Sequence, residues 1–198
     1  LDITNSQSIK NSISKVSKKY SKIDVLVNNA AYQGDDKIRT TNFENLDVSS
    51  WNKAIDVNLT GIFQLCQQVG KVMLKQKSGN VINISSIYGI VGADQRIYGS
   101  SGLNSAVFYA TTKSAVLNLT RYLASYWNRT GIRVNTLSPG GVQNNQQKQF
   151  IKKYSQKTMI GRMAKQDEYV GALVFLCSDA SSYMTGSNLI IDGGWTAW

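Results

Sequence analysis

Asp24-Val25-Leu26-Val27-Asn28-Asn29-Ala30 is a short apolar run that ends in two Asn residues. Its residues 24–28 have the length of a buried strand, and similar runs follow at residues 80–85, 133–137 and 188–192. Apolar runs of strand length that alternate with longer stretches of helical period indicate crossover connections between parallel strands. The pattern therefore predicts a doubly wound, Rossmann-like α/β fold, with residues 1–198 in a single domain.

Three stretches carry helical periodicity, at about residues 50–75, 106–129 and 168–178. In the first, apolar residues from Trp51 to Met73 recur every three or four positions, which places one apolar stripe against the sheet. Ser49 or Ser50 is expected to cap its start. The Gly- and Ser-rich segment 92–105 is too polar for a core and is predicted as a surface loop. Ligands of such folds bind beyond the carboxyl ends of the strands, so the polar residues there are the candidates for function.

The composition excludes several kinds of chemistry. The chain has no His, so it can form neither a Ser-His-Asp or Cys-His nucleophile nor a zinc site that needs imidazole. Cys66 and Cys177 are too few for a disulfide framework and are typical of reduced core residues in a cytoplasmic protein. No apolar run approaches the roughly 20 residues that cross a bilayer. We therefore expect a globular protein with no membrane partner and no metal site.

The net charge of +10 is concentrated in two clusters, one on the predicted opening helix and one in segment 148–165, which has no acidic residue. Their members are Lys10, Lys15, Lys18, Lys19 and Lys22 in the first, and Lys148, Lys152, Lys153, Lys157, Arg162 and Lys165 in the second. Neither cluster adjoins a nucleic-acid-binding motif, so we expect no nucleic acid partner. The first is interpreted as a solvated helix face, and the second as a surface that faces an anionic small substrate.

Tyr109 and Lys113 form the best acid–base pair that the sequence offers. Residues four apart lie on one face of a helix, so the Lys113 ammonium is expected near the Tyr109 phenol, where it would lower the phenol's pKa. An unperturbed phenol has a pKa near 10, and a downward shift favours proton exchange near neutral pH. In a chain without His, this pair is the candidate for proton transfer.

Several residues at the predicted strand ends form an ordered pattern together with this pair. They are Asp2, Asn28-Asn29-Ala30-Ala31, Asp56-Val57-Asn58, Asn83-Ile84-Ser85-Ser86, Tyr109, Lys113, Pro139-Gly140 and Asp192-Gly193-Gly194. In this pattern the sequence resembles the short-chain dehydrogenase/reductase family over almost its whole length. Taken singly, each residue has a structural interpretation as well; Asn58, for example, would satisfy backbone groups at a helix irregularity.

The resemblance implies hydride transfer between NAD or NADP and a carbonyl/alcohol pair. Tyr109 would be the general acid or base, Ser86 would orient the reacting oxygen, Lys113 would bind the nicotinamide ribose, and Asn58 would hold a water in a proton relay. The resemblance also implies a set of cofactor-binding residues. These are Asp2, Asn28, Ala30, Tyr109, Lys113, Pro139, Gly140, Val142 and Asn144.

Two departures from the family stand out. The Gly-rich phosphate-binding turn, Thr-Gly-x-x-x-Gly-x-Gly, does not occur in the sequence. We therefore expect the natural protein to carry about 60 further residues, with the first strands and that turn, so that this chain is the C-terminal three quarters of the domain. Ser86 and Tyr109 are also 23 residues apart, and the excess lies in segment 92–105 with Arg96, Tyr98 and Asn104.

The residues after Pro139-Gly140 bear on the substrate. Segment 143–157 is the expected substrate lid, and its Asn and Gln residues are interleaved with lysines, which suits a hydroxylated, anionic, sugar-like molecule. The long loop and the Trp-rich C-terminus also look similar to family members of surface-sugar or flagellin-modification pathways. The alternatives are a 3-oxoacyl-thioester reductase and a non-catalytic scaffold that lacks the phosphate loop.

Apolar residues all round the helices at about 50–75 and 106–129 predict a homodimer or homotetramer. They include Leu117, Leu119, Leu123, Tyr126 and Trp127.

Overall fold

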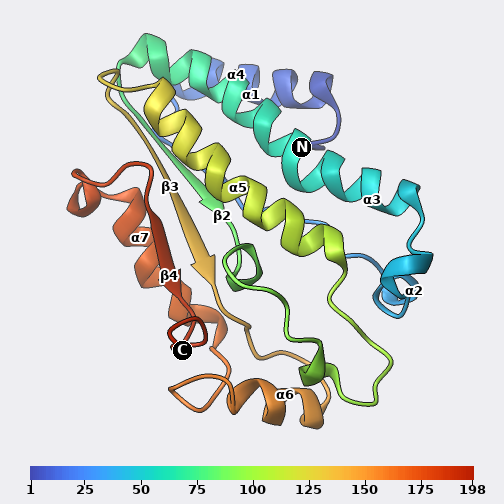
Figure 1. Ribbon diagram of the computed structural model, residues 1–198. Helices are drawn as coiled ribbons and strands as arrows, with labels where there is room; N and C mark the ends of the chain where they lie inside the picture. Colours follow the sequence, from blue (N-terminus) through green and yellow to red (C-terminus); the bar gives the residue numbers. More distant parts are fainter.

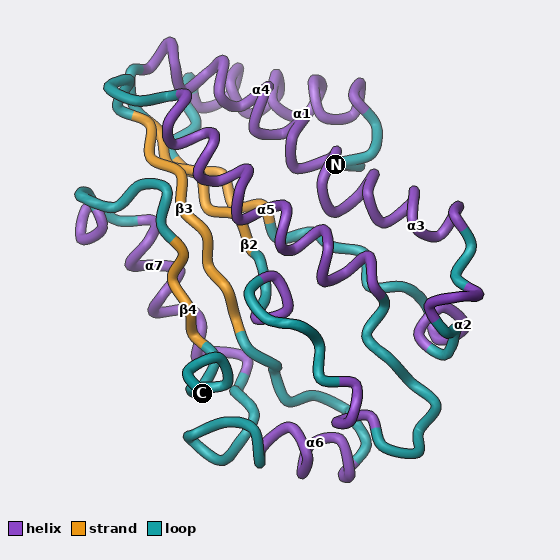
Figure 2. Tube along the Cα trace, in the orientation of Figure 1, coloured by secondary structure: helices purple, strands orange, loops and turns teal.

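The computed structural model describes all of residues 1–198 and places four parallel strands in one sheet (Figure 2). The strands are β1 (Val25–Asn28), β2 (Gly79–Ile84), β3 (Ile132–Pro139) and β4 (Asn188–Ile191), in the order β1-β2-β3-β4. All four predicted strands are present, with ends within two residues of the expected ones. The parallel α/β fold predicted from the sequence is therefore confirmed.

Helices cover both faces of this sheet (Figure 1). On one face, α4 (Gly61–Gln76) and α5 (Val107–Tyr126) pack on Val81 of β2 and Val134 of β3, and α1 (Ser6–Tyr20) packs beside α4. On the other face, α7 (Val170–Cys177) packs Leu176 on Ile82 and Leu137. Successive strand residues point to opposite faces, so a run such as Val81-Ile82 contributes to both cores.

The predicted helix at 50–75 is present, but it has three segments. These are α3 (Val48–Ile55), a π-helical turn from Asp56 to Thr60, and α4. The predicted cap was wrong by two or three positions, because Asp47 caps α3 by accepting a hydrogen bond from the backbone N–H of Ser50 at 2.9 Å. π-Helical turns are rare and often mark functional positions, and this one contains Asn58.

Segment 92–105 is more ordered than a surface loop. It contains a 3-10 turn, Gln95–Tyr98, in which Ile97 is only 2% exposed and packs in a small core with Ile87, Tyr154 and Trp195. The prediction that the segment contributes nothing to a core was therefore wrong, because one apolar residue among many polar ones is enough to anchor it. Two short helices complete the fold, α2 (Asp36–Arg39) and α6 (Lys148–Ser155).

Only some of the apolar residues of α5 are exposed, where they could contact a second copy of the chain. Leu117, Leu123 and Trp127 are buried within the chain, so they are not the interface residues that the sequence suggested. Tyr122 and Tyr126 are exposed and stacked, with ring centroids 5.9 Å apart. The homodimer or homotetramer stays a prediction. None of the helices combines the length and apolarity needed to span a membrane.

Candidate active site

A cavity of about 450 Å³ opens at the carboxyl ends of β2 and β3. Ser86, Tyr109 and Lys113 line it together, although they come from a strand end and a helix that are separated by the long 92–105 segment. Four of the expected cofactor-binding residues lie on the same cavity wall: Pro139, Gly140, Val142 and Asn144. The parallel topology brings these groups to one edge of the sheet.

The turn after β2 holds the two serines in different roles. The Ser86 hydroxyl accepts a hydrogen bond from the backbone N–H of Tyr88 at 3.2 Å and lines the cavity. The Ser85 hydroxyl donates to the Lys113 carbonyl at 2.7 Å, which fixes α5 against the strand end. A side chain on Gly89 would place its Cβ 2.7 Å from the same carbonyl oxygen, so only Gly allows this close approach.

Tyr109 lies in the first turn of α5 and is mostly buried. Burial raises the pKa of its phenol above the ordinary value, and the neighbouring Ser86 hydroxyl opposes that rise. The prediction that Lys113 brings the pKa of Tyr109 below its ordinary value was wrong for the protein without a bound cofactor. The Lys113 ammonium lies 5.8 Å from the centre of the Tyr109 ring, too far to outweigh the loss of solvent around the hydroxyl.

Lys113 is 3% exposed, and burial lowers the pKa of its ammonium to about 8. The ammonium donates one hydrogen bond within the chain, to the Ile84 carbonyl at 2.7 Å. An ammonium has three N–H donors, so two remain for a molecule in the cavity that Lys113 lines. This donor set fits the pair of hydroxyls of a ribose.

Asn58 makes contacts that differ from its expected role. Its amide oxygen accepts a hydrogen bond from the Tyr32 N–H at 2.6 Å, and its amide nitrogen donates to the Tyr32 carbonyl at 2.9 Å and to the Thr112 hydroxyl at 3.2 Å. The side chain is 1% exposed and does not line the cavity. It therefore fastens the segment after β1 to α5, and a role in holding a relay water stays a prediction.

Replacing Asn58 with Ala is expected to lower the free energy of unfolding by about 2–4 kcal/mol, because both backbone groups of Tyr32 lose their buried partner. Urea unfolding measures the change. Asn52→Ala is the matched control, since Asn52 is an exposed Asn on the preceding helix. Equal stability of the two variants would show that the Asn58 contacts carry no net free energy.

Three of the expected cofactor-binding residues do not line the cavity. Asn28 is buried, and its amide nitrogen donates to the Asn83 side chain at 2.8 Å. The neighbours Asn29 and Ala31 line the cavity in place of Asn28 and Ala30. Asp2 lies before α1, where its carboxylate accepts hydrogen bonds from the Thr4 backbone and hydroxyl at 2.9 and 2.8 Å. Their roles in cofactor binding stay predictions.

Residues 1–196 match a family model described as enoyl-(acyl carrier protein) reductase. The chain is also 35% identical over 198 residues to the 3-oxoacyl-(acyl-carrier-protein) reductase FabG of Thermotoga maritima, covering 98% of this chain and 74% of that protein. It belongs to the short-chain dehydrogenase/reductase family. Members of this family are NAD(P)-dependent oxidoreductases.

Other similar proteins extend the comparison. Post-translational flagellin modification protein A of Campylobacter coli is 34% identical over 98% of this chain and 76% of its own length. A short-chain dehydrogenase of Leptospira borgpetersenii with bound NAD+ is 40% identical, with a TM-score of 0.91 over 99% of this chain and 74% of that one. A gluconate 5-dehydrogenase of Burkholderia cenocepacia, in complex with NADP and tartrate, is 29% identical. Its TM-score is 0.88, over 100% of this chain and 74% of that one.

In this member of the short-chain dehydrogenase/reductase family, the expected lid is anchored by an aromatic residue of α6. Tyr154 is 3% exposed, stacks on Trp195 with ring centroids 4.3 Å apart, and accepts a hydrogen bond from the Gly141 backbone N–H. A Cβ on Gly141 would lie 2.7 Å from the Tyr154 ring, so the glycine allows this packing. The C-terminal Trp195 therefore has a structural role beneath the lid.

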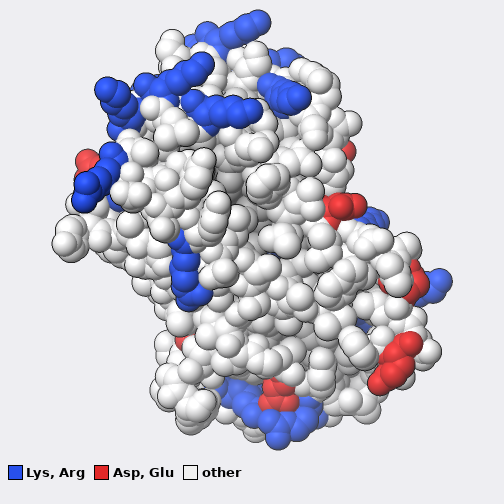
Figure 3. Space-filling model, turned by 45° about the horizontal axis from the view of Figure 1, so that its top comes forward, with Lys and Arg blue, Asp and Glu red and all other residues white.

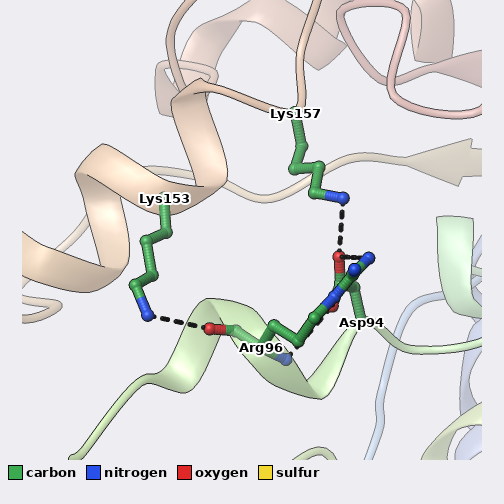
Figure 4. Close-up of polar contacts among 4 residues, drawn as sticks. All are labelled: Asp94, Arg96, Lys153 and Lys157. Atoms are coloured by element: carbon green, nitrogen blue, oxygen red, sulfur yellow. Dashed lines mark hydrogen bonds and ion pairs between the residues drawn. The ribbon is translucent and has the colours of Figure 1, made fainter.

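The cations of the lid region do not reach the cavity. Lys157 pairs with Asp94 at 2.8 Å, and Lys153 donates to the Arg96 carbonyl at 3.0 Å, as Figure 4 shows. The Arg96 guanidinium also pairs with Asp94, at 2.8 Å, and together with Lys157 it holds the pKa of Asp94 well below its usual range. Arg162 pairs with Glu168 at 2.6 Å. The expectation that this cluster faces the substrate was wrong, because none of its cations lines the cavity and these three bind other parts of the chain.

The charged residues on the surface also form separate groups. Figure 3 shows Lys and Arg in groups at the upper edge and at the bottom of this face, with acidic residues beside the lower group and no continuous basic stripe between them. One cation that lines the cavity was not among the residues predicted from the sequence. Arg39 lines the cavity at the end of α2, and nothing in its local sequence distinguishes it from the other surface cations.

Proposed function

We propose that this chain transfers a hydride between NAD(P) and a secondary alcohol or its ketone on a polar, anionic, sugar-like small molecule. The observation that carries the proposal is that Ser86, Tyr109 and Lys113 line one cavity at the carboxyl ends of parallel strands. NAD(P), when bound, supplies or accepts the hydride. The protein supplies position, hydrogen bonds and a proton.

Tyr109 is the proton donor in the direction of reduction. Because burial raises the pKa of its phenol, the group holds its proton at neutral pH, which is the form that donates to a carbonyl oxygen. Ser86 lies beside it and would hold the same oxygen by a hydrogen bond. In oxidation Tyr109 would accept the proton of the alcohol as a phenolate, which forms only after the phenol has released its own proton, while Ser86 would hold the same oxygen.

Lys113 and the cavity-lining residues from the end of β3 onward would hold the nicotinamide end of the cofactor. The two free donors of Lys113 suit the ribose hydroxyls, and Pro139, Gly140 and Val142 offer a surface of small and apolar groups for a planar ring. Asn144 has a free amide that can bind a carboxamide, since only its backbone N–H is used within the chain. NAD and NADP fit this end equally, because they differ elsewhere.

The lining of the cavity supports a hydroxylated substrate. Six amide side chains line it: Asn29, Gln33, Asn104, Asn144, Gln146 and Gln166. Amides both donate and accept hydrogen bonds, as hydroxyl groups require. The side chains of Asn104 and Gln146 already have hydrogen-bond partners within the chain. An extended acyl chain would leave the other four amides without partners, which costs free energy. The alternative, a 3-oxoacyl-thioester reductase, is favoured by the 35% identity to FabG of Thermotoga maritima.

A substrate screen separates the two reactions. With either cofactor, gluconate and sugar phosphates are expected to give a kcat/KM at least about 10-fold higher than acetoacetyl thioesters, because only the former satisfy the polar lining. The change in nicotinamide absorbance measures both. A higher kcat/KM for the thioester would establish the alternative, and inactivity on every sugar derivative would count against the proposal.

A further inference from the structure

The cavity wall carries a cation that forms no ion pair within the chain. Arg39 is half-buried, and none of the four ion pairs of the chain includes it. No Asp or Glu lines the cavity. The Arg39 charge acts on the cavity wall: burial raises the pKa of Tyr98 there, and the positive charge of Arg39 opposes that rise. A half-buried guanidinium without a partner favours an anion beside it.

The backbone of Arg39 is held in place by the long 92–105 segment. The Arg39 carbonyl accepts a hydrogen bond from the Asn104 N–H at 2.7 Å, and the Asn104 side chain donates to the Thr41 carbonyl at 2.9 Å. The segment is itself tied to the lid region through Asp94 and Lys157. The guanidinium is therefore carried on a backbone that is fixed relative to Tyr109, as a specificity residue requires.

Arg39 also lies where the cavity continues outward. A second chamber of about 420 Å³ shares Gln33, Arg39, Tyr98, Asn144, Gln146 and Phe150 with the first. Beyond them, this chamber is lined by Ser101, Leu103, Asn145 and Gln147, and again by no acidic residue. A substrate that reaches from Tyr109 past Arg39 would thus meet mainly amides and a hydroxyl, with one guanidinium between the two chambers.

We propose that Arg39 binds an anionic oxygen group of the substrate, a carboxylate or a phosphate, while the reacting carbon lies at Ser86 and Tyr109. The outer chamber then takes further hydroxyl groups. This inference rests on the proposed function and assigns to Arg39 the anion recognition that the lid cations do not provide. A guanidinium presents paired donors to two anionic oxygens, so Lys is a partial substitute.

The test compares anionic and neutral substrates of the same carbon skeleton. Gluconate is paired with sorbitol for the carboxylate, and fructose 6-phosphate with fructose for the phosphate. Arg39→Gln is expected to lower kcat/KM for the anion that is recognised by about 10- to 100-fold, as for the loss of a charge-assisted hydrogen bond. The neutral partners should change less than about threefold, and Arg39→Lys should recover part of the loss.

Lys37→Gln is the matched control, because it removes the same charge from an exposed residue of the same helix that does not line the cavity. Calorimetric titration of gluconate and fructose 6-phosphate gives a readout independent of turnover. Binding that needs Arg39 without any turnover would overturn the proposed function and keep the anion site. Equal losses on charged and neutral substrates, equal losses in both variants, or no binding of either anion would overturn the role of Arg39.

Discussion

Replacing Tyr109 with Phe is expected to lower the turnover number by about 10²- to 10⁴-fold, the range typical of a lost general acid. The ring stays and only the hydroxyl is lost, so the packing of α5 and the affinity for NAD(P) should be unchanged. Steady-state kinetics with gluconate and calorimetric titration of the cofactor measure the two effects. A cofactor affinity that falls with the turnover number would place Tyr109 in binding and not in proton transfer.

Tyr122→Phe is the matched control for this experiment. Tyr122 lies on the same helix and is 62% exposed, so its hydroxyl is removed from the same element without touching the cavity. Its turnover number should stay within about twofold of that of the unmodified protein. If Tyr109→Phe behaved in the same way, the chain would either use another proton donor or be a non-catalytic member of its family.

Replacing Lys113 with Met is expected to lower the activity strongly and the stability only slightly. The turnover number should fall by about 10²-fold or more, because the ammonium that positions the ribose is lost. Below pH 8, however, the folded protein buries a charge that the unfolded chain exposes to water. Removal of this charge offsets part of the stability that is lost with the hydrogen bond to Ile84.

The pH dependence of unfolding isolates the contribution of the charge. Burial lowers the pKa of Lys113 from 10.5 to about 8, so between these two values the unfolded chain binds more protons than the folded one. The free energy of unfolding of the unmodified protein should therefore rise relative to that of Lys113→Met, by about 2–3 kcal/mol in total, as the pH increases from 8 to 10.5. Urea unfolding at several pH values measures this difference.

Lys75→Met provides the control, because Lys75 is exposed at the end of α4. Its difference from the unmodified protein should not vary with pH in this window. If the difference in free energy of unfolding between the unmodified protein and Lys113→Met did not vary with pH either, the ammonium would be well solvated in the folded protein and its pKa would be close to the ordinary value.

Much of the fold could be predicted because it depends on local patterns. Each strand is a short apolar run, and the helices carry apolar residues at regular intervals, so their ends fall within a few residues of the expected positions. The irregular parts were harder. Ile97 contributes to a core only because Tyr154 and Trp195, far along the chain, cover it.

The residues of the candidate site also differ in how far the sequence could predict them. Ser86, Tyr109 and Lys113 could be found because they follow a strand or share a helix face, and parallel topology brings them together. Arg39 could not be found, because its place on the cavity wall depends on pairing between α2 and Asn104. The direction of the Tyr109 pKa was also beyond the sequence, since it depends on how much solvent the folded chain leaves around the phenol.

The most direct test of this account is a crystal structure of the protein with oxidised NAD or NADP and gluconate. We expect one hydroxyl oxygen of gluconate to lie within hydrogen-bonding distance of both Ser86 Oγ and Tyr109 Oη, with the nicotinamide beside Lys113. Gluconate bound away from Ser86 and Tyr109, or a nicotinamide outside the cavity that they line with Lys113, would contradict the proposed active site.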